Sequence, residues 1–114
     1  MRILGLVFAG TATSQRPEMA RFVEDTLNLR RVQIGGVEAD LFELPDGSWF
    51  AVSDPNAMGD TDRAIGFRVE NLADAIAELR AAGIPVDEPA ENGRQRFAHF
   101  RAPDGELYEL VEDR

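Results

Sequence analysis

Apolar and polar positions follow the same succession of patterns in the two halves of the chain. An apolar run over residues 2–10 shows little alternation with polar residues, so it predicts a strand buried on both faces. A helical pattern comes next. Three further strands are then expected over residues 31–33, 37–44 and 48–53. The first half therefore has the order strand, helix, strand, strand, strand.

The helix in this first half has recognisable signals at its start. Thr13 or Ser14 is expected to cap it, and Pro17 suits its first turn. Four apolar residues at helical spacing form the predicted buried stripe, namely Met19, Phe22, Val23 and Leu27.

The second half repeats this order, beginning with a strand over residues 64–69. Asn71 is a favourable helix cap, and Gly83 followed by Pro85 is typical of a helix end. The predicted buried stripe of this second helix comprises Leu72, Ile76, Leu79 and Ala82. An irregular strand, a loop and a hairpin follow, over residues 84–87, 88–93 and 95–112.

Each half also contains a Pro-Asp-Gly tripeptide between apolar runs, over residues 45–47 and 103–105. A glycine that supplies a positive φ in such a place is typical of a tight hairpin. We therefore predict an α+β fold of two tandem βαβββ modules in one domain, residues 1–114. Module one is expected over residues 1–53, a linker over 54–62, and module two over 63–114.

Composition narrows the range of functions. The formal net charge of -9 disfavours nucleic acid, which requires clustered basic residues. No apolar run approaches the roughly 20 residues of a membrane-spanning helix, so we expect no membrane insertion and a cytoplasmic protein. Cysteine and lysine are absent and His99 is the only histidine. Thiolate and lysine nucleophiles are therefore excluded, and any imidazole chemistry within one chain depends on His99.

The repeated βαβββ order, the helix over residues 71–84 and the ending from His99 to Leu110 together resemble the vicinal oxygen chelate superfamily. This superfamily includes glyoxalase I, extradiol dioxygenases and bleomycin resistance proteins. The resemblance implies a mixed sheet cupped around a cavity, with the helices on the convex side. It also implies a small-molecule ligand in the cavity.

Enzymes of this superfamily hold a divalent metal on four side chains from the first and last strands of each module. In this chain the corresponding positions are Ile3 (to within one or two residues), Ala51, Ala64 and Glu109. Three aliphatic side chains offer no metal ligand, because a hard dication needs oxygen or nitrogen donors. We therefore expect no metal and no other cofactor. A divalent metal at a rearranged or dimer-shared site is the alternative.

The two turns also predict which side chains share a face of the sheet. The second turn places His99 opposite Glu109, Phe97 opposite Val111 and Arg101 opposite Leu107, all on the face away from the helix. Phe100, Tyr108 and Leu110 are expected to face the helix. Equivalent pairing in the first hairpin places four side chains on the cavity side, namely Leu41, Glu43, Trp49 and Ala51. Phe42, Phe50 and Val52 are expected on the opposite face, behind the sheet. Gly66 and Arg68 of the fifth strand are expected on the cavity side as well. The candidate ligand-binding residues are Glu43, Trp49, Arg68, Phe97, His99, Arg101 and Glu109.

Each candidate has a functional and a structural interpretation. His99 and Glu109 could form a general acid–base or ligand-binding dyad, or a simple cross-strand pair. Trp49 could stack on a planar or cationic ligand, or pack against a neighbour or a second subunit. Arg68 and Arg101 could bind a ligand carboxylate or phosphate, or could neutralise Glu109.

The leading hypothesis is a metal-free homodimer that binds and sequesters a small molecule, as the bleomycin resistance proteins do. The acidic balance of the chain and Trp49 favour a cationic or aromatic ligand. The alternative is an enzyme: a lyase or isomerase with His99 and Glu109 as catalytic residues, or a metal-dependent lyase, isomerase or dioxygenase of the same superfamily. A third hypothesis is an interaction module without a small ligand.

Overall fold

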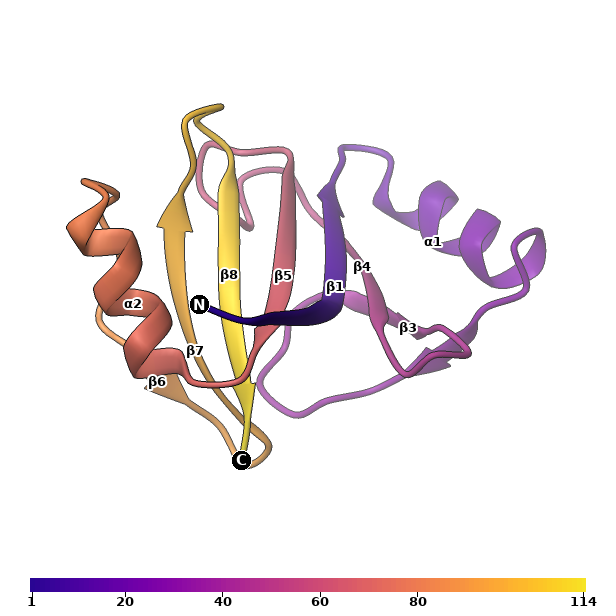
Figure 1. Cartoon of the computed structure of the whole chain (residues 1–114). Coiled ribbons are helices and arrows are strands. Elements are labelled where there is room, and N and C mark those ends of the chain that lie inside the picture. Colours follow the sequence, from indigo (N-terminus) through magenta and orange to yellow (C-terminus); the bar gives the residue numbers. More distant parts are fainter. The chain divides into compact units, whose positions relative to one another are not determined.

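The computed structural model describes residues 1–114, and its elements follow the predicted order of two βαβββ runs. The first run comprises β1 (Ile3–Ala12), α1 (Arg16–Asp25), β2 (Arg30–Val32), β3 (Asp40–Glu43) and β4 (Trp49–Ser53). The second comprises β5 (Arg63–Val69), α2 (Leu72–Ala81), β6 (Ala90–Glu91), β7 (Gln95–Arg101) and β8 (Leu107–Asp113). This order confirms the predicted α+β class and the tandem βαβββ arrangement (Figure 1).

The chain forms two compact units. Residues 8–64 form the N-terminal unit, and residues 1–7 together with 65–114 form the C-terminal unit. The predicted module bounds at residues 1–53 and 63–114 stay a prediction. No helix is long and apolar enough to cross a membrane.

Strands of the N-terminal unit lie in the order β2, β3, β4, β1. β4 pairs with β3 in antiparallel fashion and with β1 in parallel fashion, so the sheet is mixed. Leu41 lies opposite Ala51 and Glu43 opposite Trp49, which confirms the predicted register of the first hairpin. At its turn Gly47 has a φ of +86°, a conformation that glycine adopts without steric cost.

One face of these strands is covered by α1, which lies beside β3 and β4 in Figure 1. The core between helix and strands consists of Ala20, Val23, Phe42 and Val52, with Met19, Leu29 and Phe50 packed against it. The predicted helix-facing side of the first hairpin is thus confirmed.

Two features of α1 differ from the prediction. Gln15 is the N-cap residue and makes no side-chain capping bond, whereas the Thr13 hydroxyl accepts a hydrogen bond from the Gln15 amide at 3.1 Å. Phe22 and Leu27 are 45% and 51% exposed. Leu27 lies beyond the end of the helix. Phe22 is rotated by about 100° around the helix axis from the buried Val23, so it lies outside the buried stripe. Pro17 lies in the first turn as expected.

The third strand is shorter than predicted. It begins at Asp40 instead of residue 37. The amide of Val37 donates a hydrogen bond to the carbonyl of Ile34 at 3.2 Å, so Val37 belongs to the turn at Gly35 and Gly36.

Strands of the C-terminal unit lie in the order β5, β8, β7, β6. The antiparallel pair of β7 and β8 has His99 opposite Glu109 and Phe97 opposite Val111, which confirms the predicted register. α2 packs on the other face, against a core of Val69, Leu72, Ala75, Ile76, Ala98 and Leu110. Phe100 packs against the same core, and its ring lies 5.6 Å from that of Tyr108, as expected for side chains on the helix side.

Local signals fix both ends of α2. Asn71 caps the helix by accepting a hydrogen bond from the Asp74 amide at 2.9 Å. At the other end Gly83 has a φ of +83°, and the amides of Gly83 and Ile84 donate to the carbonyls of Arg80 and Leu79. This is the Schellman motif that a glycine after a helix favours. Ala82, predicted in the buried stripe, is exposed because it is the C-cap residue beyond the last helical turn.

Two further predictions are corrected. β1 is not buried on both faces: Ile3, Leu4 and Leu6 are 47%, 49% and 55% exposed. An apolar run shows that a strand is hydrophobic, but its burial depends on what covers each face. The predicted loop over residues 88–93 contains the short strand β6, which pairs with β7, and the strand expected over 84–87 is a single bridge between Val86 and Phe100.

Candidate functional site

The His99 and Glu109 side chains form a close ion pair on the face of the C-terminal unit that points away from α2. The Nε2 atom of His99 lies 2.6 Å from Oε2 of Glu109. His99 comes from β7 and Glu109 from the directly opposite position of β8, so strand pairing alone brings them together. The imidazole is 37% exposed and the carboxylate 15% exposed. The pair is therefore shielded on the carboxylate side and accessible on the imidazole side.

This geometry raises the pKa of His99 above its ordinary value of 6.5. The hydrogen bond to Glu109 is the main cause, burial acts against it, and the negative charges of Glu109 and Asp87 add to the increase. The imidazole donates through Nε2–H to Glu109. Its Nδ1 can then accept a hydrogen bond from a bound molecule when the ring is neutral and donate one when the ring is protonated.

Two neighbours shape the surroundings of the imidazole. The Phe97 ring packs edge-on against it, with ring centroids 5.9 Å apart and an interplanar angle of 76°. The Asp87 amide donates to the His99 carbonyl at 2.9 Å, which anchors the segment carrying Asp87 beside β7. Sequence analysis did not identify Asp87. The antiparallel bridge between Val86 and Phe100 would have placed it next to His99, but so short a strand has too weak a pattern to give its register.

The two candidate arginines of this unit have partners other than Glu109. Arg68 forms an ion pair between Nη1 and Oδ2 of Asp113. The Nη1 atom of Arg101 donates to the Gly105 carbonyl at 3.0 Å, at the hairpin turn. Arg68 is thus paired with Asp113, and Glu109 with His99. The predicted roles of Arg68 and Arg101 in ligand binding stay predictions.

Trp49 and Glu43 lie on neighbouring strands of the N-terminal unit, directly opposite each other. Glu43 forms an ion pair with Arg30, with 2.8 Å between Oε1 and Nη2. Trp49 is partly buried and takes part in no ring stacking or cation–π contact. Its predicted role in ligand binding stays a prediction.

The residues present do not fit the divalent metal that the fold implies. Of the four positions predicted to correspond to metal ligands, Ala51, Ala64 and Ile3 (to within one or two residues) are aliphatic, and Glu109 is engaged by His99. No group of three or more His, Cys, Asp or Glu side chains is arranged so that it could hold a metal ion. We therefore derive no chemical step that requires a metal.

Solved structures similar to this chain share one architecture. Methylmalonyl-CoA epimerase from Mycobacterium tuberculosis superimposes with a TM-score of 0.73 at 18% identity, covering 96% of this chain and 88% of the epimerase. A glyoxalase/bleomycin resistance protein/dioxygenase superfamily member from Vibrio splendidus 12B01 gives a TM-score of 0.65 at 17% identity and covers 99% and 98% of the two chains.

A catechol 2,3-dioxygenase gives a TM-score of 0.75 at 20% identity, covering 98% of this chain but 40% of the dioxygenase. No protein-family model and no curated protein sequence matches the chain. Identities at this level establish the fold alone. The chain therefore has the vicinal oxygen chelate fold, as the repeated βαβββ pattern and the terminal hairpin predicted.

Proposed function

We propose that this protein binds a small molecule without using a divalent metal, with the His99–Glu109 pair as the polar anchor of the site. The observation that supports this most directly is the 2.6 Å contact between Nε2 of His99 and Oε2 of Glu109. Glu109 is the one side chain of metal-ligand type among the four positions, and its carboxylate is already paired with His99. A ligand then meets the imidazole and not a metal ion.

The charges around the site refine the class of ligand. We expected a cationic or aromatic compound because Glu43 and Glu109 are acidic. Both carboxylates are paired, Glu43 with Arg30 and Glu109 with His99, which removes the main argument for a cationic ligand. When protonated, His99 offers its Nδ1–H to a hydrogen-bond acceptor such as a carbonyl or carboxylate, and the Phe97 ring favours an aromatic or apolar portion beside it.

A homodimer is part of this proposal. Each unit has few residues with which to enclose a ligand, and pairing of two copies would deepen the site and cover exposed apolar side chains. The exposed Ile3, Leu4 and Leu6 of β1 support such an interface, since contiguous apolar side chains on a surface are typical of protein contacts.

Proton transfer is the second candidate function, and it is favoured by the raised pKa of His99. A hydrogen-bonded, partly accessible imidazole whose pKa lies above 6.5 is suited to general acid–base catalysis near neutral pH. A lyase or isomerase reaction would use His99 to deliver or remove the proton, while Glu109 fixes its tautomer and stabilises its charged form. The two candidates differ in whether the bound compound is recovered unchanged.

The first test is the metal content of the purified protein, measured by mass spectrometry. Thermal unfolding should be repeated after chelation and after addition of manganese, nickel, zinc and iron(II). We expect substoichiometric metal and an unchanged melting temperature. Stoichiometric metal, or a clear rise in melting temperature with one ion, would contradict the proposal and direct attention to a metalloenzyme with differently placed ligands.

The second test is a compound screen by thermal shift, with wild-type protein, His99→Gln and the control Arg94→Gln. Arg94 lies in the same unit, is exposed, and has no side-chain partner. A ligand of the proposed site should stabilise the wild type and Arg94→Gln but not His99→Gln. Recovery of the compound unchanged supports binding, whereas conversion supports the acid–base enzyme. Equal stabilisation of His99→Gln would remove His99 from the site.

A further inference from the structure

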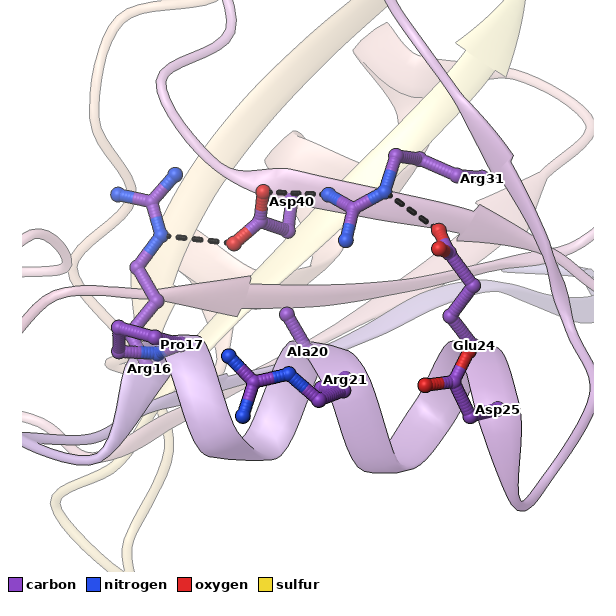
Figure 2. A pocket seen from close by; sticks show the side chains of 8 residues that line it. All are labelled: Arg16, Pro17, Ala20, Arg21, Glu24, Asp25, Arg31 and Asp40. Atoms are coloured by element: carbon purple, nitrogen blue, oxygen red, sulfur yellow. Dashed lines mark hydrogen bonds and ion pairs between the residues drawn. The ribbon is translucent and has the colours of Figure 1, made fainter.

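A second candidate site lies on the helix side of the N-terminal unit, in a groove between α1 and strands β2 and β3. Its volume is about 460 Å³. The groove is lined by Arg16, Pro17, Ala20, Arg21, Glu24, Asp25, Arg31 and Asp40 (Figure 2). These residues lie on the face that carries the helix. Only Pro17 was singled out in the sequence, as a residue of the first helical turn, and none of them belongs to the site of His99.

Asp40 holds one wall of the groove in place. One of its carboxylate oxygens accepts from Nε of Arg16 at 2.9 Å and the other from Nη1 of Arg31 at 2.6 Å. Burial by itself would raise the pKa of Asp40, but the hydrogen bonds from the two arginines outweigh burial and lower it. Asp40 is therefore ionised at neutral pH, and both guanidinium groups are fixed by a permanent charge.

Each of these arginines still has donors to offer. In addition to its bond with Asp40, Arg16 donates through Nη1 to Asp54 at 2.9 Å, and Arg31 donates through Nε to Glu24 at 2.7 Å. The Nη2 group of each side chain makes no hydrogen bond within the chain. Arg31 also lies over the Phe42 ring at 5.0 Å, which restricts its orientation further. Guanidinium groups fixed in this way lose little conformational entropy when they bind an anion.

The helix contributes one cation and one anion that have no partner. Arg21 and Asp25 both line the groove, and neither forms a hydrogen bond or an ion pair. They are four residues apart on α1, but arginine preceding an acid is the less favourable order for such a pair. Figure 2 shows Arg21 in the middle of α1 and Asp25 at its end, and no dashed line joins either side chain to another residue.

The balance of charges points to a ligand that has both signs. Three arginines and three carboxylates line the groove, so it is formally neutral. The chain as a whole has a formal charge of -9, which disfavours the approach of a free anion. We propose that the groove binds a small zwitterion whose carboxylate and ammonium groups are several bonds apart. The carboxylate would meet Arg21 and the free donor of Arg31 or Arg16, and the ammonium would meet Asp25, one helical turn further along α1.

A set of simple probes tests this proposal by NMR titration of the full-length protein. ε-Aminocaproate has both charges separated by a chain, glycine has both charges adjacent, caproate lacks the ammonium, and amylamine lacks the carboxylate. We expect ε-aminocaproate to bind with a dissociation constant of about 1 mM. Each of the other three should bind about tenfold more weakly, since each loses a charge-assisted hydrogen bond or the correct spacing.

Three variants complete the experiment. Arg21→Gln and Asp25→Asn should each weaken ε-aminocaproate binding about tenfold, because each removes one charge partner. The matched control Arg94→Gln and the variant Glu109→Gln should bind as tightly as wild type, which separates this groove from the site of His99. Circular dichroism would establish that each variant is folded. Absence of saturable binding, equal binding of caproate and ε-aminocaproate, or unchanged affinity of Arg21→Gln would each overturn the proposal.

Discussion

His99 and Glu109 show how a hydrogen bond between two strands shifts the pKa of a residue. Because the chain has one histidine, the pKa of His99 can be followed directly in an NMR titration. We predict a pKa above 6.5 in the wild type and below it in Glu109→Gln, because the variant loses the hydrogen bond and the charge while burial of the ring still disfavours protonation. Glu38→Gln, at an exposed position of the N-terminal unit, should leave the pKa unchanged. The same pKa in the wild type and Glu109→Gln would show that the two side chains do not interact in solution.

The same pair predicts the direction of a pH effect on stability. A group whose pKa is raised on folding stabilises the folded state fully below its unfolded pKa, here about 6.5, and this contribution disappears as pH rises through the folded pKa. Wild type should therefore exceed Glu109→Gln in free energy of unfolding most clearly at mildly acidic pH. Urea unfolding of both proteins across the pH range measures the difference. A gap that widens with increasing pH would contradict the prediction.

At the scale of elements, Asp40 connects α1 to β2 and β3 through its two arginines. Its side chain is 23% exposed. Replacing it with asparagine leaves Arg16 and Arg31 without their shared counterion, so we predict that Asp40→Asn lowers the free energy of unfolding by about 2 kcal/mol. Because the pKa of Asp40 is lowered from 3.8, this contribution is present above about pH 4 and disappears as pH falls through the folded pKa. Chemical unfolding at neutral and acidic pH measures both effects, and Asp62→Asn, which removes no side-chain bond, is the control.

The end of α2 depends on the backbone conformation of one residue. Gly83 has a φ of +83° and free space around the position of a Cβ atom, so a side chain there meets conformational strain but no clash. Gly83→Ala should lower the free energy of unfolding by about 1 kcal/mol. Gly35→Ala is a matched control, because Gly35 also has free space and does not have a positive φ. Equal effects of the two substitutions on thermal or urea unfolding would show that the strain at Gly83 is negligible.

These elements also show which features the sequence could predict. The cap at Asn71, the end at Gly83 and the register that places His99 opposite Glu109 all depend on residues close together in the chain, and the sequence predicted them. The exposure of Leu6 depends on how distant segments cover the strand, which no local pattern contains. The groove between α1 and strands β2 and β3 was not predicted, because it also depends on how segments distant in the sequence pack together.

For the whole molecule, the exposed side chains of β1 lead to a prediction about assembly. We expect a dimer in sedimentation experiments, and a monomer after joint replacement of Leu4 and Leu6 by lysine. The formal charge of each chain is -9, so two added lysines reduce the repulsion between two copies. Loss of the dimer would therefore follow from the loss of apolar contact and not from charge. Val37→Lys is the control, because Val37 is similarly exposed, at 47%, but does not belong to β1. This variant should remain a dimer. A monomeric wild type would contradict the dimer, and a double variant that remains dimeric would show that β1 is not the interface.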